Sequence, residues 1–195
     1  MAISSEQIVQ IAIEILNRDG IEKLTMRTLA KELDIKAASL YRHIENKQDL
    51  YGLITESICA GIQVDATGDT KNSIILLCEQ YRLRLLEVRD SVAVFEESLP
   101  KTTKRMELIK TVYQLIKEWG VSDCNLLAAS NMLNNYVLSF TADEMRFRRY
   151  YTEATGLDEN LFGPGLSQTP NDIDSQFIYG IEVLLAGFKA MENAG

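Results

Sequence analysis

Residues 23–47 concentrate the side chains of this sequence that can bind phosphate groups and read bases. The segment holds six lysines and arginines against three carboxylates, a net charge of +3, whereas the whole chain carries −8 and the remainder therefore −11. Lys and Arg bind phosphate oxygens, and Arg can also donate two hydrogen bonds to one guanine. The charge distribution predicts a small cationic module with a polyanionic partner, joined to an acidic body with a different partner.

The apolar residues of this segment have the spacing of two short helices joined by a tight turn. Thr25 can cap the first helix, residues 34–36 can form the turn, and the small Ala30 allows two helices to cross steeply. The expected inner faces are Met26, Leu29, Ala30 and Leu33, then Ala37, Leu40, Tyr41 and Ile44. The pattern predicts a helix-turn-helix whose second helix can enter a major groove of DNA.

Two further helices must hold this motif in place. Ser4 and Gln7 have the spacing of a capping box, Gly20 is a natural stop, and a stripe of apolar residues lies between them, so a helix is expected over residues 5–19. Asn46 can cap another helix over residues 47–62. Leu29 and Leu40 are expected to pack the helix-turn-helix against the first helix.

The stretch LTMRTLAKELDIKAASLYRHIENKQDLY resembles the signature of the tetracycline-repressor (TetR/AcrR) family of bacterial transcription regulators. The resemblance covers about residues 5–55, and NYVLSFTADE (135–144) and QFIYGIEVLLAGF (176–188) are more loosely similar to the family's C-terminal domain. It implies an all-α fold with an N-terminal three-helix helix-turn-helix domain (residues 1–47). A larger C-terminal helical domain for ligand binding and dimerisation (residues 48–195) would follow, with helix 47–62 as the connector.

The family resemblance also implies which side chains contact DNA. Lys47 can meet a phosphate at a helix N-terminus, and Arg27 is the best candidate for reading guanine. Arg42 can reach a phosphate or face water. Ala37 and Ala38 replace residues that often read bases or start the helix in relatives, which leaves the operator sequence open. Asp34 replaces the usual turn glycine, and the turn is still expected to form because Asp tolerates a left-handed backbone better than most residues. The expected DNA-binding residues are Thr25, Arg27, Lys36, Ala37, Ala38, Ser39, Tyr41, Arg42, His43 and Lys47.

The acidic body is also expected to be helical. Helices are predicted over residues 70–90, 92–98, 102–119, 122–151 (capped by Ser122) and 172–191, with a linker at 65–69 and a loop at 155–171. The sequence contains no convincing strand pattern and no internal repeat.

The last two long helices carry more apolar surface than a single stripe requires. The resemblance implies that these helices from two subunits form a four-helix dimer interface, although the same residues could instead be the core of a monomer. The expected interface residues are Leu133, Val137, Phe140, Phe177, Ile181, Leu184 and Phe188. Gly180 and Gly187 would let another helix approach closely.

A pocket for a small-molecule effector is implied among the body helices. Several polar residues fall in apolar surroundings there, and a buried amide without a partner costs about 1–3 kcal/mol, which a ligand could offset. Ordinary core packing is the alternative for each residue. The candidate lining is Phe95, Leu99, Met106, Tyr113, Asn131, Met132, Asn135, Tyr136 and Ser139, with Asn134 beside it.

Catalysis and metal binding are disfavoured by the residues available. His43 is the only histidine, Cys59, Cys78 and Cys124 are far apart, and no metal cluster, phosphate loop or nucleophile elbow is present. The cysteines are expected to be buried free thiols in a reducing cytosol, and Glu96–Glu97 and Asp143–Glu144 to be solvated. No cofactor, membrane span or secretory signal is expected.

The predicted function is a cytoplasmic bacterial repressor that binds a palindromic operator as a homodimer and is released by a small molecule. The alternatives are a DNA-binding regulator without a small ligand, an all-helical enzyme, and a helical interaction module.

Overall fold

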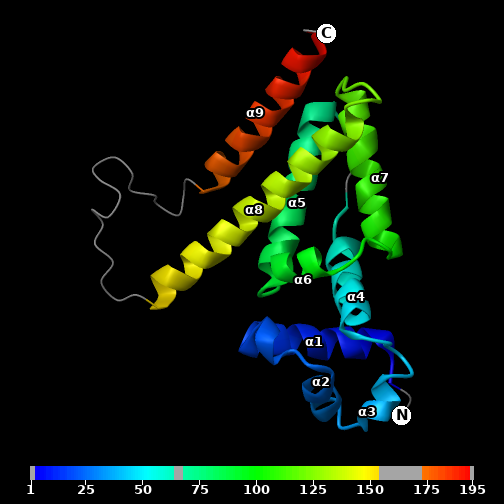
Figure 1. Ribbon diagram of the computed structural model, residues 1–195. Coiled ribbons are helices and arrows are strands. Elements are labelled where there is room, and N and C mark those ends of the chain that lie inside the picture. The colour runs from blue at the N-terminus through cyan, green and yellow to red at the C-terminus, as the bar shows by residue number, and fades with distance from the viewer. Residues whose placement is uncertain (1–2, 64–67, 154–172, 194–195) are drawn as a thin grey trace. The chain divides into compact units, whose positions relative to one another are not determined.

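The computed structural model describes residues 3–63, 68–153 and 173–193, and the described residues form helices without a strand, which confirms the predicted all-α class (Figure 1). No helix in these ranges is long and apolar enough to cross a membrane. The helices are α1 (Ser5–Asp19), α2 (Met26–Glu32), α3 (Ala37–Leu40), α4 (Lys47–Ala60), α5 (Thr70–Leu86), α6 (Ser91–Glu97), α7 (Thr103–Glu118), α8 (Leu126–Glu153) and α9 (Ile173–Asn193), with a short 3₁₀ turn, η1 (Ile21–Lys23).

Helix α1 begins and ends where its local sequence signals predict. The Ser4 side chain accepts a hydrogen bond from the Gln7 N–H, and the Gln7 side chain accepts one from the Ser4 N–H, so the capping box is present. Gly20 ends the helix with φ +84°. The buried face includes Ile8, Ala12 and Ile15, each without exposed surface.

The chain divides into two compact units. Unit 1 comprises residues 1–64 and 79–111, and unit 2 comprises residues 65–78 and 112–195. Helices α5 and α7 each contribute to both units, so this division differs from the predicted boundary at residues 47/48. That boundary between a DNA-binding and a ligand-binding domain stays a prediction.

In unit 1, α4 is the central helix. It packs against α1 and against α6 (Figure 1). Its Glu56 carboxylate accepts a hydrogen bond from the Lys104 N–H at 2.8 Å, which satisfies a free donor at the start of α7. From α7, Arg105 donates to the carbonyls of Ser98 and Phe95 at the end of α6. The three helices are therefore joined by hydrogen bonds to the end of α6 and the start of α7 as well as by apolar packing.

In unit 2, α8 and α9 pack through an aromatic cluster. The Tyr136 ring stacks on Phe177 at 5.7 Å between centroids, and Phe140 lies 5.1 Å from Phe177. The Tyr136 hydroxyl donates to the Phe177 carbonyl at 3.0 Å. Tyr136 covers Gly180 so closely that a Cβ there would collide with its ring, so Gly180 serves packing within the protomer.

Several element ends differ from the predictions. Helix α5 stops at Leu86 instead of residue 90. The Ser91 hydroxyl donates a hydrogen bond to the Leu85 carbonyl at 2.8 Å, and Asp90 adopts a left-handed backbone, so the helix cannot continue. Ser122 does not cap α8; it closes a turn with Asn125, and its hydroxyl donates to Glu192. The start of α9 is confirmed to within one residue, whereas the predicted loop at 155–171 lies outside the described residues.

Candidate nucleic-acid interface

The α2–α3 pair has helix-turn-helix geometry. The Thr25 hydroxyl caps α2 by accepting from the Thr28 N–H at 3.0 Å. The turn closes when the Ile35 N–H donates to the Ala30 carbonyl, and Ala30 itself is only 4% exposed. Asp34 takes the left-handed conformation (φ 51°) that glycine adopts most easily, as the sequence predicted.

The recognition segment is shorter as a helix than its apolar spacing predicts. α3 covers only Ala37–Leu40, and residues 41–43 continue as turns. Leu40 and Ile44 are buried, as expected for the inner face of this segment. Tyr41 was expected on the same inner face, but it is 52% exposed and belongs to the outer face. The Ser39 hydroxyl accepts from Arg42 at 3.2 Å, which orients that guanidinium.

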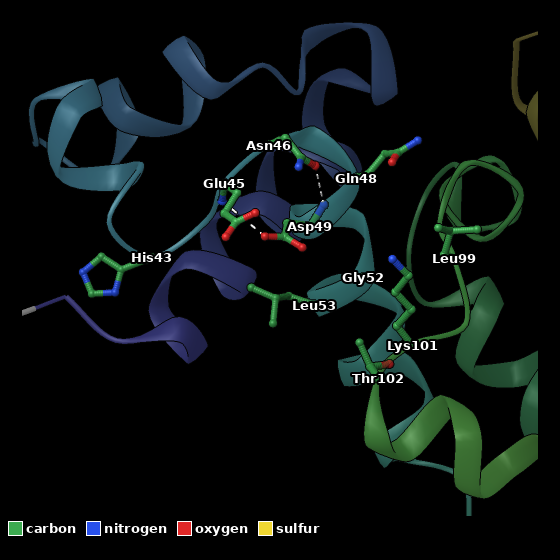
Figure 2. A pocket seen from close by; sticks show the side chains of 10 residues that line it. All are labelled: His43, Glu45, Asn46, Gln48, Asp49, Gly52, Leu53, Leu99, Lys101 and Thr102. Carbon is green, nitrogen blue, oxygen red and sulfur yellow. Dashed lines mark hydrogen bonds between the residues drawn. The ribbon is translucent and has the colours of Figure 1, made fainter.

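The start of α4 is held by two reciprocal hydrogen bonds. The Asn46 side chain accepts from the Asp49 N–H at 3.0 Å, and the Asp49 carboxylate accepts from the Glu45 N–H at 3.2 Å (Figure 2). The exposed Lys47 ammonium lies 5.2 Å from the ring centroid of Tyr51, which is buried. This cation–π contact places Lys47 at the helix N-terminus, where the helix dipole favours an anion.

The structure brings all the predicted DNA-binding residues into unit 1. Ser39 is half-buried and the others are exposed. A cleft of about 320 Å³ borders this surface, between the start of α4 and the α6–α7 connection (Figure 2). Its lining includes His43, Asp49, Leu53, Leu99 and Lys101.

The predicted dimer-interface residues are mostly core residues of the protomer. Leu133, Val137, Phe177, Ile181 and Phe188 are at most 8% exposed, and Phe140 and Leu184 are half-buried. The protomer itself covers the five buried side chains, and the assignment of these seven residues to a dimer interface stays a prediction. The exposed large apolar residues on the same helices are Leu127, Met132, Tyr179, Val183 and Met191.

The predicted effector lining does not share one environment. Phe95, Leu99 and Met106 belong to unit 1, and the other six candidates belong to unit 2. Asn131, Asn134 and Asn135 are exposed, so the argument from buried amides is wrong for this protomer. Met132 and Ser139 are also exposed, Phe95 is buried, and Tyr113 and Tyr136 are half-buried. Their role in ligand binding stays a prediction.

Two smaller expectations also need correction. Cys124 is exposed, whereas Cys59 and Cys78 are buried as expected. Glu144 is buried and forms an ion pair with Arg148, so it is not part of a solvated face. Within the described residues, no group of three His, Cys, Asp or Glu side chains is placed to hold a metal ion.

Sequence reasoning missed residues whose neighbours are distant in the chain. The Asn17 side chain accepts a hydrogen bond from the Arg89 N–H, and the Asp90 carboxylate accepts one from the Ile21 N–H. The partners are about seventy residues apart, so no local sequence pattern predicts these bonds. Lys23 and Lys31 belong to the cationic segment, although the sequence does not place them among the predicted DNA-binding residues. Lys31 lies one helical turn after Arg27.

Comparison with known proteins decides the family. Residues 8–54 match the tetR family of bacterial regulatory proteins, and residues 65–192 match the tetracyclin repressor-like C-terminal domain. The chain belongs to the tetR family. It is a DNA-binding transcriptional regulator of that family, and the predicted resemblance is confirmed.

Individual relatives support the assignment over the whole chain. The class D tetracycline repressor of Escherichia coli is 26% identical over 98% of this chain and 92% of its own length. Among solved structures, Mycobacterium smegmatis BioQ is 29% identical with a TM-score of 0.82, covering 96% of this chain and 98% of BioQ. A structure of BioQ with its natural double-stranded DNA operator is 28% identical with a TM-score of 0.77, covering 95% of this chain and 98% of that chain.

Proposed function

We propose that this protein is a ligand-responsive repressor that binds a palindromic operator as a homodimer and leaves it when a small molecule binds. The observation that carries the proposal is the exposed face of residues 36–47, where Lys36, Tyr41, Arg42, His43 and Lys47 reach solvent along α3 and at the capped start of α4. That face has the groups that position a protein on phosphates and read base edges. The solved BioQ–operator structure supports DNA as the partner.

Two copies are needed because one short recognition segment makes few base contacts. A two-fold dimer would place two segments on successive turns of one face of the duplex, which requires a palindromic operator. The exposed apolar residues of α8 and α9 are the proposed dimer surface. On α9, Tyr179, Val183 and Met191 follow a spacing of four or eight residues, and Gly187 between them has no heavy atom within 4 Å of a Cβ position.

The proposed release mechanism is a shift between two conformations. α6 packs against α4, and α4 carries Lys47 at its DNA end. A ligand that moves α6 would therefore change the position of the phosphate contacts. A tenfold loss of operator affinity requires only about 1.4 kcal/mol of coupling between the two sites.

The chemistry of the effector is left open by the cavities described. A cavity of about 230 Å³ in unit 2 is lined by Phe140, Glu144, Phe147 and Gln176, with Asp143 and Ile173. This is below the 300 Å³ or more that is common for small-molecule sites. A regulator that responds to a partner protein instead of a small ligand is therefore kept as the second candidate. Catalysis is not part of the proposal, and the proposed location is the bacterial cytoplasm, where operator DNA lies.

A thermal-shift screen against metabolites and antibiotics, followed by operator binding, tests the proposal. A true effector should raise the Tm of the purified protein and weaken its binding to an operator selected from a random duplex library. Compounds that raise Tm but leave operator affinity unchanged would contradict release by a ligand. Absence of salt-dependent duplex binding would contradict the DNA-binding function itself.

A further inference from the structure

A concave surface on unit 1 lies beside the helix-turn-helix, between the end of α1 and the outer side of α2. It has a volume of about 560 Å³. None of its residues is needed to pack α2 against α3, whose contact uses the opposite, buried side of α2. The lining residues are Arg18, Asp19, Lys23, Arg27, Thr28, Lys31 and Glu32.

The carboxylates of this concavity are already occupied. The Arg18 guanidinium bonds Asp19 at 2.8 Å and Glu32 at 2.9 Å. The hydrogen bond from Arg18 holds the pKa of Asp19 below its ordinary value, and the bonds to Asp19 and Glu32 raise the pKa of Arg18. Both carboxylates therefore pair with one arginine, and the four cations and two carboxylates leave the concavity with a net charge of +2.

The remaining cations have no ion-pair partner within 4.0 Å among residues 3–63, 68–153 and 173–193. They are Lys23, Arg27 and Lys31, and all three are exposed. Arg27 and Lys31 stand one turn apart on the same side of a seven-residue helix, where like charges repel. Such a surface is unfavourable in the free protein and becomes favourable when an anion neutralises it.

We propose that Lys23 and Lys31 extend the DNA-binding surface past Arg27 and bind phosphates outside the groove that α3 enters. The inference rests on the proposed function, since it adds backbone contacts to the same head. The occupant is the DNA backbone because three cations are spread over two elements of an open concavity, which suits a row of phosphates. Arg27 belongs both to the predicted DNA-binding residues and to the lining of this concavity, so the two surfaces adjoin.

Substitution of Lys31 on duplexes of two lengths tests the inference. One duplex ends at the palindrome selected in vitro, and the other extends it by ten base pairs on each side. K31Q in both subunits should reduce the slope of log affinity against log salt by about 2 on the extended duplex, which corresponds to about 30-fold weaker binding at 0.15 M salt. K23Q should act in the same direction. On the trimmed duplex, both variants should bind as the wild type does.

Lys110→Gln is the matched control, because Lys110 is an exposed lysine of α7 and its loss changes the net charge equally. K31Q should also melt no lower than the wild type, since it relieves repulsion within α2. An unchanged salt slope on the extended duplex would overturn the inference, as would an equal effect on both duplexes. If the wild type itself showed no salt-dependent binding, the proposed function would fail instead.

Discussion

The Asp90 carboxylate accepts a hydrogen bond from the backbone N–H of Ile21 at 2.9 Å, joining the residue before α6 to the turn after α1. Beside it, the Arg89 N–H donates to the Asn17 side chain at 2.7 Å. Gly20 completes the joint, since its φ is +84° and a Cβ there would lie 3.1 Å from atoms of Arg89 and Asp90. A movement of the α5–α6 corner therefore acts directly on the end of α1, in addition to acting through α4.

Asp90→Ala should destabilise unit 1 by about 2 kcal/mol, measured by urea denaturation. The variant loses a charged acceptor that is worth about 1.5–3 kcal/mol, and alanine tolerates φ 59° poorly. Asp90→Asn is the control, because asparagine keeps an acceptor oxygen and adopts the left-handed conformation readily. Equal stability of the alanine variant and the wild type would show that the joint contributes nothing.

The elements that sequence reasoning predicted well are those whose ends are set by nearby residues. α1 has a capping box and a glycine stop within its own sequence, and α4 has Asn46 at its start, so both helices begin where expected. The α5–α6 corner was missed because its partners Asn17 and Ile21 are about seventy residues away. A periodic pattern contains no information about such contacts.

The apolar faces of α8 and α9 show a second limit of prediction from sequence. Apolar spacing identified Phe177 and Ile181 as residues that some surface must cover, but it could not tell whether the protomer or a partner covers them. Tyr136 and Phe140 of the same chain cover Phe177. The exposed residues Tyr179 and Val183 each lie two positions further along α9.

Lys47→Ala should weaken binding to every duplex sequence and reduce the salt slope by about one unit for each head, about two for a dimer. If Lys47 contacts a phosphate and no base, as proposed, sequence preference should not change. Tyr51→Leu removes the ring that positions the ammonium and should reproduce part of the loss, whereas Tyr51→Phe keeps the ring. The Tyr51 hydroxyl is buried without a hydrogen-bond partner, so its removal should not reduce stability. A slope that is unchanged in Lys47→Ala would remove Lys47 from the phosphate contacts.

Thiol chemistry should separate the three cysteines at neutral pH. Burial raises the pKa of the Cys59 thiol to about 12, so this group stays protonated and unreactive in the folded protein. Cys78 is also buried, whereas Cys124 is exposed. A disulfide reagent should therefore modify one thiol rapidly, and Cys124→Ser should abolish that reaction.

The raised pKa of Cys59 predicts that the free energy of unfolding falls as the pH becomes alkaline. The folded state holds the Cys59 proton more tightly than the unfolded state, so its contribution to the free energy of unfolding is complete below the ordinary pKa. It is lost as pH rises from the ordinary pKa toward 12. Cys59→Ala should remove this part of the alkaline destabilisation, and an identical pH profile in the variant would contradict the assignment.

Val183→Glu should convert the proposed dimer to a monomer. Val183 is 51% exposed on α9, so the glutamate costs little in the isolated protomer. In a two-fold interface both copies of the carboxylate would be buried without a counter-charge, and at about 3 kcal/mol each this would weaken association roughly 10⁴-fold. Sedimentation equilibrium measures the change directly.

Leu83→Glu is the matched control, because Leu83 is 56% exposed on α5, outside the α8–α9 surface, and its variant should stay dimeric. Operator affinity should fall with the dimer in Val183→Glu, because a single head cannot span both half-sites. A Val183→Glu protein that remained dimeric would move the interface away from this face of α9.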